Sequence, residues 1–207
     1  VCGPVFADKA QALSRAWTRI ARKPSVRQQV LILKHDTHEQ YIASEPQAWP
    51  VADTLAQLPP GFHLHGIYIH ARPLPGQYPD LEAWLYKNCV SPLELAQHIT
   101  HFRRHGIGRE VSLYVRLRDE AILRYRFSGS ALESQLFSQA ADGTVTDNGI
   151  QAALHSGARL TRDFVWQVAA AGELSVEKTS ALWDRSGKVG ADWLPYAQFS
   201  LPPLSAA

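Results

Sequence analysis

The stretch FHLHGIYIHA, residues 62–71, is the most informative segment of this chain for the fold. Its β-branched and aromatic residues are typical of a strand that is buried in a sheet. Before it, apolar runs at 29–34 and 40–44 flank a polar turn and predict a β-hairpin. Apolar residues at helical spacing over 8–22, with Asp8 as N-cap, predict a helix that packs its apolar stripe on that sheet.

After the strand, a proline-containing loop leads to predicted helices at 80–88 and 91–105. The second helix has a strong start signal, because Ser91 can cap it, Pro92 takes its first position and Glu94 follows three residues after the cap. We therefore interpret Ser91 and Glu94 first as a capping box.

The rest of the chain continues the alternation of strands and helices. Strands are predicted at 110–117, 121–127, 164–169 and 173–179, and helices at 130–137, where Ser130 and Glu133 form a second capping box, and at 150–155. This order predicts an α/β fold with a mixed β-sheet flanked by helices. We expect one domain over 1–207, with 160–200 as a possible appended β-hairpin lobe.

Composition excludes some classes of protein. The 21 Lys and Arg residues nearly balance the 19 Asp and Glu residues, which gives no general case for a nucleic-acid or membrane partner. No apolar run is long enough to span a membrane, and Val1-Cys2-Gly3-Pro4 lacks the build of a signal peptide. The sequence predicts a bacterial cytoplasmic protein, and export by a specialised secretion system is compatible with it.

Six short strings resemble one bacterial branch of the JAB/MPN metalloprotease superfamily. They are GPVF (3–6), YIASEP (41–46), PGF (60–62), SGSALE (128–133), GEL (172–174) and LW (182–183). The resemblance runs over nearly the whole chain and implies a JAB/MPN-like fold with cytidine-deaminase-like layering. Active members of the superfamily hold Zn²⁺ with His-x-His-Pro and Ser-x-x-Asp motifs and use a Glu on an earlier strand as general base.

The matching positions lack most of this zinc motif. Ile69 and Ala71 stand where the two histidines would be, and Arg72 stands where the proline would be. Ser91 and Glu94 take the place of Ser-x-x-Asp. The early strand offers only Arg27, Gln28 or Gln29 where the Glu would be. From the resemblance we therefore expect no metal, no cofactor and no catalysis in this cleft, whose candidate residues are Tyr68, His70, Ser91 and Glu94.

Other side chains allow a rearranged site. His63 and His65 share a strand face, whereas His70 is expected on the opposite face unless a bulge intervenes. Asp80, Glu94 or Glu45 could complete a relocated zinc site. Cys89 precedes a helix N-terminus, where a thiolate is stabilised, although a small buried residue is the simpler interpretation.

The hairpin at 110–127 carries a candidate binding surface. Alternation predicts that Arg116, Arg118, Arg124 and Arg126 share one sheet face, either as a solvated surface or as an anion site. Trp17, Trp84 and Trp166 are predicted to lie in the core.

These features lead to three hypotheses for function. The first is an inactive JAB/MPN-like domain that binds another protein. The second is a divergent hydrolase, an isopeptidase or toxin-like effector, that uses rearranged His, Cys and acidic residues with zinc. The third is an anion- or nucleic-acid-binding module built on the arginine hairpin, although a nucleic-acid partner is not expected from the overall charge.

Overall fold

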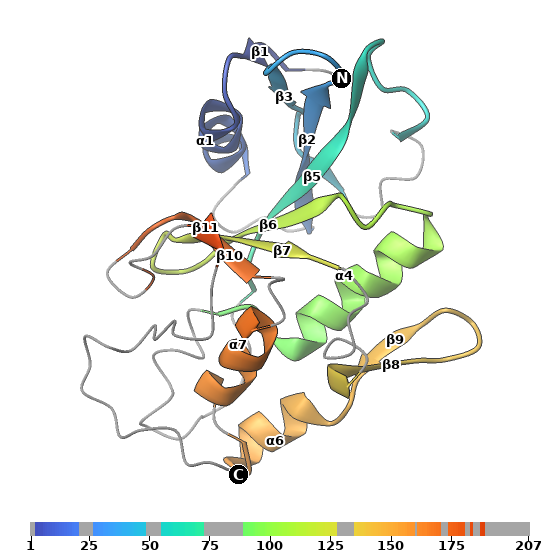
Figure 1. The fold of residues 1–207 in the computed structure, drawn as a ribbon, viewed down its shortest axis with the longest axis vertical. Helices are drawn as coiled ribbons and strands as arrows, with labels where there is room; N and C mark the ends of the chain where they lie inside the picture. Colours follow the sequence, from blue (N-terminus) through green and yellow to red (C-terminus); the bar gives the residue numbers. More distant parts are fainter. Residues whose placement is uncertain are drawn as a thin grey trace.

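The computed structural model describes residues 3–20, 27–48, 55–72, 89–127, 135–159, 161–170, 174–180, 183 and 187–188 (Figure 1). The helices are α1 (Lys9–Arg19), α4 (Pro92–Arg104), α6 (Ile150–Ser156) and α7 (Thr161–Ala170). The strands are β1 (Val5–Phe6), β2 (Gln28–His35), β3 (Tyr41–Ala43), β4 (Gln47–Ala48), β5 (Phe62–His70), β6 (Ser112–Arg116), β7 (Ile122–Arg126), β8 (Phe137–Gln139), β9 (Val145–Asp147), β10 (Leu174–Lys178) and β11 (Gly187–Lys188).

The main sheet has the order β1-β3-β2-β5-β6-β7-β10-β11, and β4 pairs with β2 at the side of this path. β5 and β6 are parallel, and the other paired strands in the sheet are antiparallel. The predicted class, a mixed sheet flanked by helices, is confirmed. The JAB/MPN-like layering stays a prediction.

Alternation along the strands divides the core between two faces of the sheet. On the face that α1 covers, here the α1 face, the buried strand residues are Val30, Ile32, Tyr41, Ala43, Tyr68, Tyr114 and Ile122. On the other face, here the α4 face, residues such as Leu31, Ile69 and Val115 form one cluster with α4, α6 and α7. Figure 1 shows α1 beside one end of the sheet and the other three helices together beyond β6 and β7.

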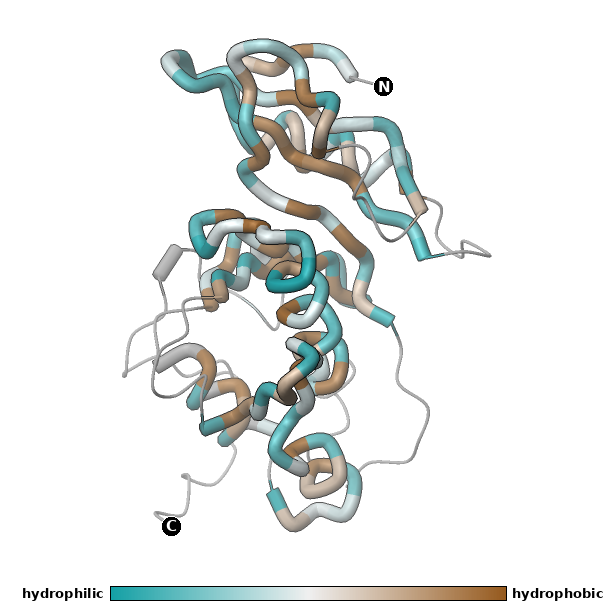
Figure 2. The backbone as a smooth tube through the Cα atoms, turned by 90° about the vertical axis from the view of Figure 1, so that its right-hand side faces the viewer, coloured by the Kyte–Doolittle hydropathy of each residue, from teal (hydrophilic) through white to brown (hydrophobic). Residues whose placement is uncertain are grey.

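The sequence signals explain why these elements form. Asp8 accepts a hydrogen bond from the backbone N–H of Gln11 at 2.9 Å, so α1 begins where the N-cap predicts. Its predicted stripe is buried at Leu13, Ala16 and Ile20. The two predicted hairpins form as β2–β3 and β6–β7. Figure 2 shows hydrophobic residues in several stretches along the backbone. Many of the apolar residues of the strands and helices are buried in the core.

Two secondary-structure predictions were wrong. The predicted strand 164–169 belongs to α7, where Phe164, Val165 and Val168 are buried at helical spacing. Phe137, predicted in a helix, begins β8, which forms a hairpin with β9. A short apolar run fits the period of a helix as well as that of a strand, and tertiary packing decides which of the two forms.

Several predicted features lie outside the described residues. These are the helix at 80–88 with Trp84, the Ser130 and Glu133 capping box, and the side chain of Trp166. The predicted strand at 173–179 is confirmed as β10, which pairs with β7 in the main sheet.

Candidate functional site

A buried polar cluster lies between the start of β2 and the first turns of α4. Ser91 accepts a hydrogen bond from the Glu94 N–H at 3.0 Å, which confirms the N-cap and orients the first turn. Glu94 and His98 are one turn apart, so they lie on the same side of α4. Both are buried, at 6% and 0% exposure.

Arg27 joins these two side chains. Its Nη2 is 2.7 Å from Glu94 Oε1 and 2.7 Å from His98 Nε2, and its Nη1 donates to Gln97 Oε1 at 3.3 Å. The second Glu94 oxygen accepts from the Arg72 backbone N–H at 3.4 Å. An arginine only donates hydrogen bonds, so His98 Nε2 is the acceptor and is unprotonated.

Burial determines the electrostatics of this cluster. It lowers the pKa of His98, and the Glu94 carboxylate, whose Oε1 is 3.9 Å from His98 Nε2, only partly opposes this shift. Burial also lowers the pKa of Arg27, while the charge of Glu94 acts in the opposite direction. A neutral imidazole and a charged Arg–Glu pair are the consistent protonation states at neutral pH.

The strand positions matched to zinc ligands lie on the same face as this cluster. Ile69 is 1% exposed in the core of the α4 face, and Ala71 packs against that core. The next residue, Arg72, contacts Glu94. Alternation places Gln29 on this face with Leu31, and its fully buried amide has no hydrogen-bond partner. The residues proposed for the degenerate cleft therefore converge here in part.

Tyr68 and His70 lie on the other side of the sheet. Tyr68 is fully buried in the α1-face core, and its hydroxyl has no hydrogen-bond partner. The His70 ring packs edge-on against it, with centroids 5.7 Å apart, and burial lowers the pKa of His70 to about 4. The four cleft candidates are thus divided into two pairs, with Ser91 and Glu94 on the α4 face.

A β-bulge in β5 changes the orientation of the histidines. Ile32 pairs with Gly66 and Leu33 with Leu64, which leaves His65 as the extra residue. His65 consequently lies against Tyr114 on the α1 face, 3.1 Å from its hydroxyl, and burial lowers the pKa of His65 to about 4. The bulge brings His65 to the same face as His70, which is the exception to opposite faces that a bulge was expected to allow.

Gly66 makes this arrangement possible. A Cβ at this position would lie 2.3 Å from the Tyr114 ring, so only glycine lets the ring cross the strand beside His65. The remaining histidine of the segment, His63, binds Asp36 at 2.8 Å on the surface.

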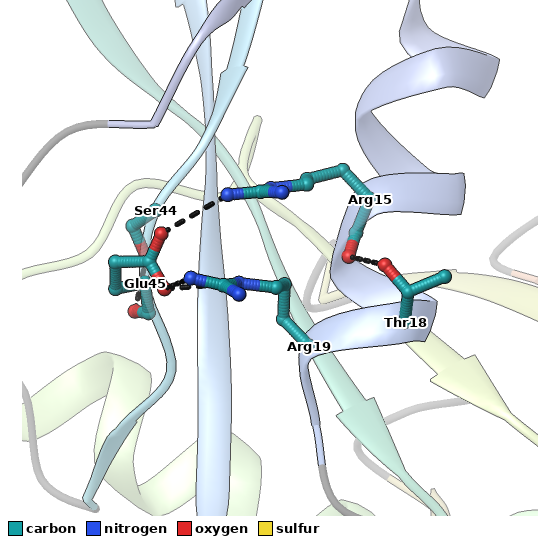
Figure 3. A network of polar contacts seen from close by, with 5 residues as sticks. All are labelled: Arg15, Thr18, Arg19, Ser44 and Glu45. Atoms are coloured by element: carbon teal, nitrogen blue, oxygen red, sulfur yellow. Dashed lines mark hydrogen bonds and ion pairs between the residues drawn. The ribbon is translucent and has the colours of Figure 1, made fainter.

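Two further residues considered for a rearranged site, Glu45 and Cys89, have other surroundings. Figure 3 shows Glu45 held by Arg15 and Arg19 of α1, and the bond to Arg19 lowers the pKa of the Glu45 carboxyl. Cys89 is buried and lines an apolar cavity of about 20 Å³, room for about one water molecule. This agrees with the interpretation of Cys89 as a small buried residue. Asp80 lies outside the described residues.

The four hairpin arginines do not form one solvated face. Arg116, Arg124 and Arg126 alternate onto the α1 face, but Arg118 lies in the turn between β6 and β7. Arg116 is only 13% exposed, with its guanidinium 3.2 Å from the centroid of the Trp17 ring. Arg124 contacts Glu177 at 3.5 Å, while Arg118 and Arg126 are exposed.

Sequence reasoning missed His98, Trp17 and Lys178 as partners of these groups. The spacing of Glu94 and His98 was a readable signal, because residues four apart in a helix share a face. The contacts of Arg27 with α4 and of Trp17 with β6 and β10 join distant segments and have no local signal.

Within the described ranges, no group of three His, Cys, Asp or Glu side chains is placed to hold a metal ion. The helices described here include none that is long and apolar enough to cross a membrane. No family model, curated protein or solved structure matches the chain.

The capping role of Ser91 leads to a specific expectation. Ser91→Ala should lower the free energy of unfolding by about 1 kcal/mol, because the Glu94 N–H loses its acceptor. Thermal and urea denaturation would measure this loss. Any partner binding should be unchanged in the folded variant, and a loss of binding at unchanged stability would assign Ser91 to a site instead.

Proposed function

We propose that this domain is a JAB/MPN-like protein-binding module that performs no zinc-dependent hydrolysis at the buried polar cluster between β2, β5 and α4. One observation carries the proposal, namely the buried contact of Arg27 with Glu94 and His98. The family resemblance, with the partner-binding role of inactive members, supplies the rest of the argument as an analogy.

The chemistry of the cluster supports this function. A hydrolytic zinc site needs three protein ligands and an open position for water. Glu94 Oε1 is already bound to a guanidinium at 2.7 Å, and the unprotonated nitrogen of His98 accepts from the same group. A fixed cation in this position repels a metal ion and uses the lone pairs that a metal would need.

The strand positions add to the argument. Ile69 and Ala71 have no lone pairs to offer, and both pack against the apolar core of the α4 face. Gln29 provides an amide on this face, and an amide cannot take a proton from water as a general base does. The residues of this cluster thus serve packing and charge pairing rather than metal binding. The proposal places the protein in a bacterial cytoplasm, as the sequence predicts.

Zinc content tests the proposal. Protein incubated with excess Zn²⁺ and desalted should retain well under one metal ion per chain by elemental analysis, and should not cleave a fluorogenic isopeptide substrate. Tightly held zinc at one ion per chain, lost in a His63→Ala/His65→Ala variant, would contradict the proposal and support a relocated hydrolase site. Equal zinc loss in a His155→Ala control would instead indicate adventitious binding.

A further inference from the structure

The α1 face carries a cationic platform formed by Trp17, Arg116 and Lys178. Arg116 in β6 pairs in register with Ile122 in β7, and Ile122 pairs with Lys178 in β10. Arg116, Ile122 and Lys178 therefore form one row across the sheet. Trp17 of α1 lies against this row, with Arg116 at 3.2 Å and Lys178 Nζ at 3.8 Å from its ring centroid.

The platform holds two positive charges close together. The Arg116 guanidinium and the Lys178 ammonium both lie close to the centroid of the Trp17 ring, so they are at most about 7 Å apart. The indole offsets part of their repulsion through cation–π attraction. An anionic group placed against both cations would offset the rest of their repulsion. The distance between the cations suits the two oxygens of one carboxylate or two neighbouring acidic side chains.

Among the described residues of this row and its hairpin, positive side chains outnumber the carboxylates. Arg116 pairs with Glu120 at 3.2 Å, and Glu120 is 59% exposed and lies in the turn. Lys178 is exposed, and its ammonium group lies over the Trp17 ring. Glu177 is shared by Lys9 and Arg124. Arg118 and Arg126 extend the exposed positive charge along the same hairpin.

A second observation points to a ligand at this row. His70 pairs in register with Arg116, so it is the next member of the row. Its Nε2 and the hydroxyl of fully buried Tyr68 both lack hydrogen-bond partners. Burying polar groups without partners is costly, so the end of the row beside Arg116 keeps two unsatisfied polar atoms.

We propose that the cationic platform docks an acidic peptide segment, rich in Asp or Glu, of the partner protein. This inference rests on the proposed binding function and names the surface and the partner chemistry. The carboxylates of Glu120 and Glu177 interrupt the positive charge, which suits the separated side chains of a peptide better than the continuous charge of a nucleic-acid backbone.

Fluorescence anisotropy tests the inference with a labelled peptide of alternating Glu and Gly. The parent domain should bind this peptide, with affinity that falls as salt rises, and should not bind the matched Gln and Gly peptide. The Lys178→Gln variant, which changes an exposed side chain, should weaken binding several-fold. Arg116→Gln/Lys178→Gln should weaken it at least tenfold, with folding checked by circular dichroism.

The matched control is Arg103→Gln/Arg104→Gln, which removes two charges from α4, away from the platform. It should bind like the parent. Equal loss in this control, no binding by the parent, or tighter binding of a single-stranded RNA would overturn the inference. Zinc analysis of the same preparation separates failure of this inference from failure of the proposed function. A domain that holds no zinc and does not bind the peptide would contradict only the proposal that the cationic platform docks an acidic segment.

Discussion

Replacing Glu94 with Gln should lower the free energy of unfolding by about 3 kcal/mol. The substitution keeps the size of the side chain but removes the negative charge that compensates Arg27. The side chains of Arg27 and Glu94 are only 15% and 7% exposed, so water cannot take over this role. Removing one partner of a buried ion pair is among the most costly single changes in a protein. Urea denaturation at neutral pH would measure the loss.

Glu39 provides a matched control for this experiment. It also pairs with a cation, Lys34, at 2.7 Å, but its side chain is 72% exposed. Glu39→Gln should therefore change the free energy of unfolding far less than Glu94→Gln does. In an Arg27→Met/Glu94→Leu variant both charges are absent, and much of the lost stability should return. Equal costs for Glu94→Gln and Glu39→Gln would contradict a structural role for the buried pair.

Acid should destabilise the domain well before its carboxylates protonate. Burial lowers the pKa of His98, and lowers that of His65, His70 and His101 to about 4. In the unfolded chain these histidines titrate near 6.5. The unfolded state therefore takes up protons first, so stability is complete above about pH 6.5 and falls as the pH drops towards 4.

Part of the dependence of the unfolding free energy on pH can be assigned to His98. A histidine that is neutral when folded and charged when unfolded contributes about 1.4 kcal/mol per pH unit. His98→Gln, which keeps an acceptor for Arg27, should make the dependence of unfolding free energy on pH between 6 and 5 shallower by about this amount. His155→Gln, at an exposed position, should leave the slope unchanged, and a flat profile in the parent would contradict the prediction.

Local signals were enough to predict much of the fold. The caps at Asp8 and Ser91 place the starts of α1 and α4, because a side-chain oxygen within three residues satisfies the free N–H groups of a helix start. Alternation of side chains predicts β2, β5, β6 and β7 and their buried residues. Where a short run such as 164–169 fits both periods, the sequence alone does not decide, and that segment packs as α7.

The candidate site depended on contacts that no local rule contains. The sequence indicated that Ile69 and Ala71 cannot bind zinc, because this follows from side-chain chemistry alone. The contact of Arg27 with Glu94 joins residues far apart in the chain, and the stacking of Arg116 on Trp17 joins a strand to the first helix. The bulge at His65 reverses the orientation of one side chain through the pairing of β5 with β2. Residue type determined which groups are able to bind, while the packing of the sheet between α1 and α4 decided which of them meet, since burial and distance set the energies of charged and polar groups.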